Sequence, residues 1–352
     1  IVFVPGSSAP YLLGGTLNMK ANVILAGEYA GSILMLADDA NVDMIVATGA
    51  LPHIGLRDLI IYGNRAQQNG DATKHGINWN ISNTTAGYTA NSTVNGLGPT
   101  ALVDPFHKNQ NLLVMMVDGP GIRAVGAHGL WQAVDVLNTT GPGILAQAND
   151  TQWVSVNAGA TAHEGWLCAG GSARYTDTKA FFCGTGLVPG TPDTYGNYLN
   201  GHGYRVTSRG QHFVNPQAQD LDGWGFSVQA HDISIQGAYI DQACQLPEWS
   251  TFLGQSPVRG GGFVSTHAGI NLQGADDCNI SCQVTSRGVV NGDISAVLAG
   301  IVRLNGSSNN NVMTVSYTTS PAILAGAAPE VVEDSYTGAG NQILTKTGLL
   351  VP

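Results

Sequence analysis

Residues 119–166 read GPGIRAVGAHGLWQAVDVLNTTGPGILAQANDTQWVSVNAGATAHEGW, and this stretch repeats itself. A glycine followed by a large apolar residue occurs three times, 22 residues apart, at Gly121, Gly143 and Gly165. The pair recurs after steps of 38, 22, 44 and 31 residues at Gly203, Gly225, Gly269 and Gly300. A fixed period interrupted by longer steps is typical of a solenoid, in which each repeat forms one coil.

Aligning the repeats produces columns of similar residues. The residue after the glycine is large and apolar, as in Ile122, Ile144, Trp166, Tyr204, Phe226, Ile270 and Ile301. Two residues later stand Ala124, Ala146, Cys168, Val206, Val228, Leu272 and Arg303. Because alternate residues of a strand share a face, both columns are predicted to point into one core. The residues between them are predicted to face outward: Arg123, Leu145, Leu167, Arg205, Ser227 and Asn271. A second buried ladder is predicted from Trp131, Trp153, Tyr175, Phe213 and Ile235.

These columns predict an all-β fold of stacked coils. A unit of two or three short strands exposes an apolar face that only a neighbouring copy can cover. The chain is therefore predicted to form a parallel β-helix whose coils rise by about 4.8 Å. The composition agrees, since 47 glycines and only 11 % charged residues favour short strands and turns over helices. The glycine that starts each coil is expected to permit a tight corner.

Charge and cysteine content argue against several classes of function. The net charge is −10 and Lys and Arg form no cluster, so neither nucleic acid nor an anionic membrane is an expected partner. The longest apolar run, near residues 112–117, is far shorter than the roughly 20 residues that cross a bilayer. Five cysteines without CxxC spacing argue against a zinc site, and we expect no metal and no cofactor. Buried free thiols are expected, although a pair between Cys278 and Cys282 stays open.

The N-terminal part carries a family resemblance. Residues 2–36 (VFVPGSSAPYLLGGTLNMKANVILAGEYAGSILML) and 54–77 (IGLRDLIIYGNRAQQNGDATKHGI) resemble the first coils of the pectate-lyase-like superfamily, in its bacteriophage tailspike branch. The resemblance implies one right-handed, single-stranded parallel β-helix domain over residues 1–352. It also implies an extracellular protein, on a virion or secreted, that forms a homotrimer. Polysaccharide and other virion tail proteins are the implied partners. The helical cap usual in that family is missing, so we expect a processed chain or the central part of a longer one.

Four insertions into the repeat are predicted, at about 79–110, 185–202, 245–268 and 288–299. The last three follow the final strand of a coil and are expected to wall a groove for an elongated glycan. The strand before them carries one outward column of Asp135, Asn157, Lys179, Gln217 and Tyr239, and a second with Gln219 and Asp241. These side chains suit hydrogen bonds to sugar hydroxyls, or form an ordinary solvated sheet face.

Carboxylates at nearly equal positions of adjacent coils could form the pair that glycoside hydrolysis requires. The candidates are Asp220, Asp222, Asp241 and Glu248, with Glu164 near the same side. Each of these aspartates could instead cap a turn. Sugar contacts are expected from Trp249, Tyr239, Lys179, Gln217, Tyr195 and Arg205.

Two motifs resemble those of polygalacturonases, namely NGHGY at residues 200–204 and GADDC at residues 274–278. In that family the aspartate pair precedes GHG, whereas here it follows, so this reading is not favoured. The sequence favours a spike protein that binds and cleaves a cell-surface polysaccharide, as a glycosidase or a lyase. A non-catalytic virion fibre or adhesin, or a free secreted hydrolase or lyase, remains an open alternative.

Overall fold

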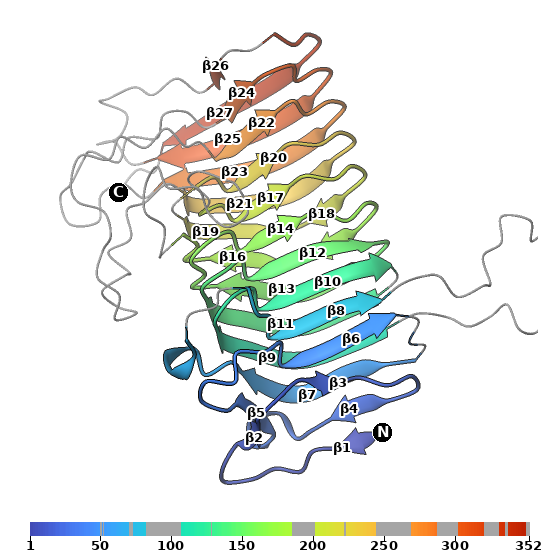
Figure 1. Cartoon of the computed structure of the whole chain (residues 1–352). Coiled ribbons are helices and arrows are strands. Elements are labelled where there is room, and N and C mark those ends of the chain that lie inside the picture. Colours follow the sequence, from blue (N-terminus) through green and yellow to red (C-terminus); the bar gives the residue numbers. More distant parts are fainter. Residues whose placement is uncertain are drawn as a thin grey trace, which may run out of the picture.

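A computed structural model of the chain describes residues 1–49, 51, 53–69, 73–81, 107–127, 129–184, 201–221, 223–243, 269–286, 302–319, 331–334 and 337–349. In these ranges the chain winds into a right-handed parallel β-helix, as the repeat and the resemblance predict (Figure 1). Two single-turn 3₁₀ helices, η1 (Tyr29–Gly31) and η2 (Arg65–Gln67), lie in the first coils. No helix within the described ranges combines the length and the apolarity needed to cross a membrane.

The described strands form two parallel sheets. Sheet A contains β1 (Val2–Phe3), β2 (Tyr11–Leu13), β4 (Ile24–Ala26), β5 (Ile33–Leu36), β7 (Gly55–Tyr62), β9 (His107–Val117), β11 (Gly129–Thr139), β13 (Gln152–Gly159), β15 (Arg174–Thr176), β16 (Lys179–Phe181), β18 (His212–Val214), β19 (Gln217–Leu221), β21 (Ser234–Ala243), β23 (Asn279–Ser286), β25 (Val312–Thr319) and β27 (Gln342–Leu349). Sheet B contains β3 (Leu17–Asn18), β6 (Ile45–Gly49), β8 (Ile77–Ile81), β10 (Ile122–Ala127), β12 (Ile144–Asn149), β14 (Trp166–Cys168), β17 (Tyr204–Val206), β20 (Phe226–Val228), β22 (Ile270–Gln273), β24 (Val302–Asn305) and β26 (Val331–Asp334).

The register of sheet B follows the glycine repeat. Ile122 pairs with Ile144 and Ile144 with Trp166, and the longer steps keep the same column from Trp166 to Tyr204 and from Phe226 to Ile270. The last predicted step is wrong by one residue, because Ile270 pairs with Val302 and not with Ile301. The shift turns Val302 and Leu304 inward and leaves Arg303 beside Asn271, so Arg303 does not point into the core.

Each middle strand of sheet A bends at a residue with left-handed backbone. These residues stand in one column from coil to coil: Asp58, Asn111, Ala133, Ser155, Asp177, Asn215 and Gly237. Asn and Asp tolerate this conformation, and Asn111 also donates from Nδ2 to Asp58 Oδ1 at 2.7 Å. We call the part of each strand before the bend the first segment and the part after it the second segment.

Two further columns of left-handed residues mark the other corners of the coil. Where the second segment ends, the column contains Met116, Asn138, Ala160, Phe182 and Asp220. Between sheet B and sheet A, the column contains Asp150, Ser172, Gly210, Asp232, Asp277, Asn310 and Gly340. Three recurrent corners give each middle coil three flat faces.

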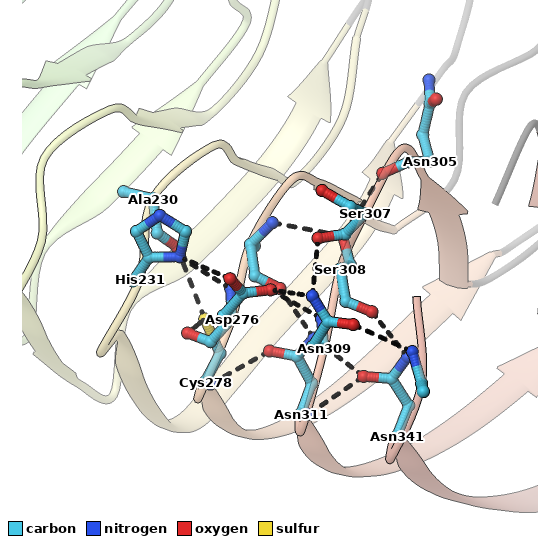
Figure 2. Close-up of polar contacts among 12 residues, drawn as sticks. Ala230, His231, Asp276, Cys278, Asn305, Ser307, Ser308, Asn309, Asn311 and Asn341 are labelled. Carbon is cyan, nitrogen blue, oxygen red and sulfur yellow. Dashed lines mark hydrogen bonds and ion pairs between the residues drawn. The ribbon is translucent and has the colours of Figure 1, made fainter. Parts of the chain in front are cut away.

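Beside the corner between sheets B and A, polar side chains link successive coils (Figure 2). Buried Asn311 donates from Nδ2 to the carbonyl of Ala275 at 2.8 Å and to Asn341 Oδ1 at 2.9 Å. Its Oδ1 accepts the backbone N–H of Cys278 at 3.0 Å. One side chain therefore joins three coils, and it satisfies backbone groups that the corner leaves without a sheet partner.

Aromatic ladders fill the interior, as the columns predict. Trp131 stacks on Trp153 at 5.3 Å, and Tyr204 stacks on Phe226 at 4.5 Å. Rings from the two sheets meet edge to face, as Trp153 does with Trp166. All these side chains are at most 1 % exposed, so they belong to the core and offer no binding surface.

Other expectations need correction or fall outside the described residues. The predicted insertion at 79–110 is too long, because residues 79–81 belong to β8 and residues 107–110 to β9. Most of 185–202 and all of 245–268 and 288–299 lie outside the described residues. The outward residues of sheet B are less exposed than predicted, since Leu145, Ser227 and Asn271 are buried.

Four of the five cysteines are described, and all four are buried free thiols, Cys278 and Cys282 included. Burial raises the pKa of the Cys168 and Cys183 thiols to about 12. Thiols this hard to ionise are poor nucleophiles, which leaves these two cysteines a packing role.

Candidate functional site

The outward face of the second segment carries the predicted polar column. Its members occupy successive coils in register: Asp135, Asn157, Lys179, Gln217, Tyr239 and Gln283. A parallel column two residues further along each strand contains Gly159, Phe181, Gln219, Asp241 and Thr285. We call these two columns the polar strip. Successive members are about 4.8 Å apart, so the strip is a regular row of planar amide, carboxylate and aromatic groups.

The N-terminal half of the polar strip is held by contacts within it. Asn157 donates from Nδ2 to Asp135 Oδ1 at 2.7 Å. The Lys179 Nζ lies 5.3 Å from the centroid of the Phe181 ring. A Cβ on Gly159 would lie 2.3 Å from Phe181 Cζ, so this ring lies flat over the glycine of the preceding coil.

Asp241 is the buried carboxylate of the polar strip. It lies on β21 beside Gln219 of the preceding coil and Thr285 of the next, and only 1 % of it is exposed. Gln217 is exposed and Tyr239 partly exposed in the neighbouring column. The strip therefore combines accessible hydrogen-bonding groups with one carboxylate that is shielded from water.

Asp220 occupies a corner and not the polar strip. It lies in the column of left-handed residues that ends the second segment, with φ of 50°. The register places it opposite residue 242, one position beyond Asp241 in the adjacent coil. The structure thus brings Asp220 and Asp241 into adjacent coils, and the corner conformation of Asp220 fits the alternative role of an aspartate that caps a turn.

The turn from the second segment into sheet B holds buried residues with polar groups, of which the sequence analysis singled out only Glu164. Glu164, His202 and Trp224 precede the coil-start glycines of three successive coils and are each at most 6 % exposed. His202 accepts the Trp224 backbone N–H on Nδ1 at 3.1 Å. Because this position reads His75, Pro120, Pro142, Glu164, His202 and Trp224 along the repeat, aligning the residues before each glycine would have revealed it.

Arg205 lies on the strand that follows this turn, contacts the turn, and is not part of the polar strip. It points outward from β17 in sheet B, and its Nη1 donates to Glu164 Oε1 at 3.4 Å. Its Nη2 donates to Gln229 Oε1 at the same distance. The predicted sugar contacts therefore divide between two faces: Lys179, Gln217 and Tyr239 on sheet A, and Arg205 on sheet B.

Four predicted site residues are not among those that the structure describes. Asp222, Tyr195, Glu248 and Trp249 lie outside the described residues. The chain leaves the described part after β16, β21, β23 and β25 and returns at β17, β22, β24 and β26. These departures share one side of the β-helix, next to the polar strip.

A second polar cluster lies at the start of the sheet B strands β6 and β8, in the N-terminal coils. Asp43 accepts hydrogen bonds from His75 Nδ1 at 2.9 Å and from Asn78 Nδ2 at 2.7 Å. Burial opposes its ionisation, but these bonds outweigh burial and lower the pKa of Asp43 to about 2. An aspartate that stays ionised at neutral pH is unsuited to donating a proton, so we assign this cluster a structural role.

Comparison with solved structures finds the same fold in other proteins. The A-module of mannuronan C-5 epimerase AlgE4 from Azotobacter vinelandii superimposes with a TM-score of 0.58 at 15 % identity, over 100 % of this chain and 88 % of that one. The corresponding AlgE6 module gives 0.54 at 14 % identity, over 100 % and 91 %. Tailspike protein 2 of the Escherichia coli O157:H7 bacteriophage CAB120 gives 0.57 at 15 % identity, over 89 % of this chain and 38 % of that one. No protein-family model and no curated protein sequence matches the chain. At these identities the likeness establishes the right-handed parallel β-helix and nothing finer.

Proposed function

We propose that this protein binds a linear polysaccharide along the polar strip and cleaves it beside Asp241. The observation that carries the proposal is the strip itself, where accessible Gln217 and Tyr239 flank a carboxylate that is 1 % exposed. A stack of coils presents equivalent groups at intervals of about 4.8 Å, which suits a ligand that is itself a repeating chain. Two structural neighbours, named as a mannuronan epimerase and a phage tailspike, support a polysaccharide as the ligand class.

For cleavage, Asp241 is proposed as one of two carboxyl groups. The second would come from Asp220, Asp222 or Glu248, which the sequence places on the same or the adjacent coil or in the next insertion. In hydrolysis, one carboxyl group donates a proton to the glycosidic oxygen as the bond breaks. The other carboxylate attacks the sugar or removes a proton from the attacking water.

The proposed setting is extracellular, on a virion or as a secreted protein. A net charge of −10 and a polar strip without a basic cluster argue against a nucleic acid as the ligand. By resemblance to phage spikes we also propose a homotrimer, with other tail proteins as its neighbours on a virion. Sedimentation of the full chain at several concentrations tests this state, and a concentration-independent monomer contradicts it.

The test of function is incubation of the full chain with bacterial capsular and O-antigen polysaccharides. New reducing ends report hydrolysis, absorbance of unsaturated uronates reports elimination, and a changed C-5 configuration without shortening reports epimerisation. We expect Asp241→Asn to lower the cleavage rate by roughly 10² to 10⁴ while glycan binding persists. Gln152→Ala, on the first segment, is the control for a change outside the strip. Binding without any product supports the fibre or adhesin alternative, and an unchanged rate in Asp241→Asn removes Asp241 from the mechanism.

A further inference from the structure

Lys179 gives the polar strip a localised positive charge. The strip's described members from Asp135 to Thr285 include no other lysine or arginine. The coil after Lys179 carries Gln217 and Gln219, which are neutral. No described carboxylate forms an ion pair with Lys179, in contrast to Arg205, which pairs with Glu164. This ammonium group is therefore not neutralised by a partner within the described part of the chain.

Phe181 lies beside that charge as a fixed aromatic surface. Its ring lies on Gly159 and meets the ring of Phe182 edge to face, with 5.5 Å between the ring centroids. The side chain faces outward from the core and is partly exposed. A ring that lies flat along a sheet face presents its plane to a ligand, and sugar rings stack on such planes through their C–H faces. The ammonium lies over this ring, 5.3 Å from its centroid. A sugar that stacks on the ring would therefore bring its substituents close to the positive charge.

We propose that Lys179 and Phe181 form a subsite for one carboxylate-bearing sugar of the bound polysaccharide. Phe181 stacks on the sugar ring, and Lys179 pairs with its carboxylate. The subsite lies two coils, or about 10 Å, before Asp241 along the strip, since each coil rises by about 4.8 Å. The inference rests on the proposed function, because it assigns a substrate class to the same face. It predicts that the preferred glycan is acidic.

The test compares acidic oligosaccharides with their carboxyl-reduced, neutral counterparts. The probes are oligomannuronate, oligogalacturonate and hyaluronan fragments, each before and after carboxyl reduction, and the readout is Kd by calorimetry on the full chain. We expect at least one acidic probe to bind about three to ten times more tightly than its neutral form, as for a partly exposed charge pair. That preference should weaken as salt concentration rises.

Variants separate the contribution of the Lys179 charge to binding from that of the Phe181 ring. Lys179→Gln should abolish the acidic preference, whereas Lys20→Gln, which removes an exposed charge in the first coils, should keep it. Phe181→Leu should weaken acidic and neutral probes alike. Gly159→Ala retains the ring but displaces it, because the new methyl group would occupy its position, and should weaken binding in the same way. Thermal unfolding of each variant confirms that the coils remain folded.

The outcomes distinguish this inference from the proposed function. Equal binding of acidic and neutral probes, or an acidic preference that survives in Lys179→Gln, overturns the subsite and leaves polysaccharide binding intact. Failure of every polysaccharide to bind, the capsular and O-antigen preparations included, overturns both. A preference that is lost in Lys179→Gln and kept in Lys20→Gln establishes the subsite.

Discussion

At the scale of the residue, the coil-start glycines serve close packing and not an unusual backbone conformation. None of Gly121, Gly143, Gly165, Gly203 and Gly225 has a positive φ, so what these positions require is the absence of a Cβ. A Cβ on Gly143 would lie 2.8 Å from the Gly165 carbonyl oxygen and 2.9 Å from Ala158 Cβ. Each glycine of the repeat therefore marks a position where one coil packs too closely on the next to leave room for a side chain.

A substitution at this position should be costly. Gly143→Ala forces a methyl group against backbone and core, and we expect a loss of about 1–3 kcal/mol in the free energy of unfolding. Gly15→Ala is the matched control, because a Cβ there meets nothing within 4 Å. Urea-induced unfolding followed by circular dichroism measures both variants, and equal stability of the two would contradict the packing argument.

At the scale of the element, the corners hold the coils in register through side chains as well as through the sheets. The bend in sheet A and the turn before it both recur at left-handed residues, several of them Asn, Asp or Gly. Their residue types predict turns, but the sequence does not predict which corner each residue occupies. That assignment needs the pairing of strands that are 22 or more residues apart.

Asn311 tests the contribution of the corner ladder. Asn311→Ala removes three hydrogen bonds and leaves the Cys278 N–H and the Ala275 carbonyl without this partner in a buried position. We expect a loss of about 2–4 kcal/mol in the free energy of unfolding. Asn279→Ala, at an exposed position of β23, should change it by less than about 0.5 kcal/mol. A similar small change in both variants would show that the ladder is not needed for stability.

At the scale of the whole molecule, each coil contacts chiefly the coils beside it. Sheet pairing joins consecutive coils throughout, from β1 with β4 to β25 with β27 (Figure 1). Such a solenoid is stabilised by the sum of its coils and of the interfaces between neighbours. Chain length, insertions and surface chemistry can then vary in one coil with little effect on a distant coil.

This arrangement predicts that distant substitutions act independently. Gly143 and Asn311 belong to well-separated coils with no shared partner. In the double variant, the losses in the free energy of unfolding should add to within about 0.5 kcal/mol. The same urea titrations measure the sum, and a coupling larger than about 1 kcal/mol would mean that the stack transmits strain over several coils.

The sequence by itself determined the repeat, the inward columns and the outward column from Asp135 to Tyr239, because sheet pairing places residues of equal offset above one another. Only the tertiary structure decided that Asp220 lies on a corner, that Arg205 serves sheet B, and that Phe181 rests on Gly159. Those facts depend on left-handed residues that redirect the chain, and on contacts between side chains 22 or more residues apart. The one-residue error in the predicted register of the last repeat has the same origin, because the strand pairs in the register that buries Val302 and Leu304.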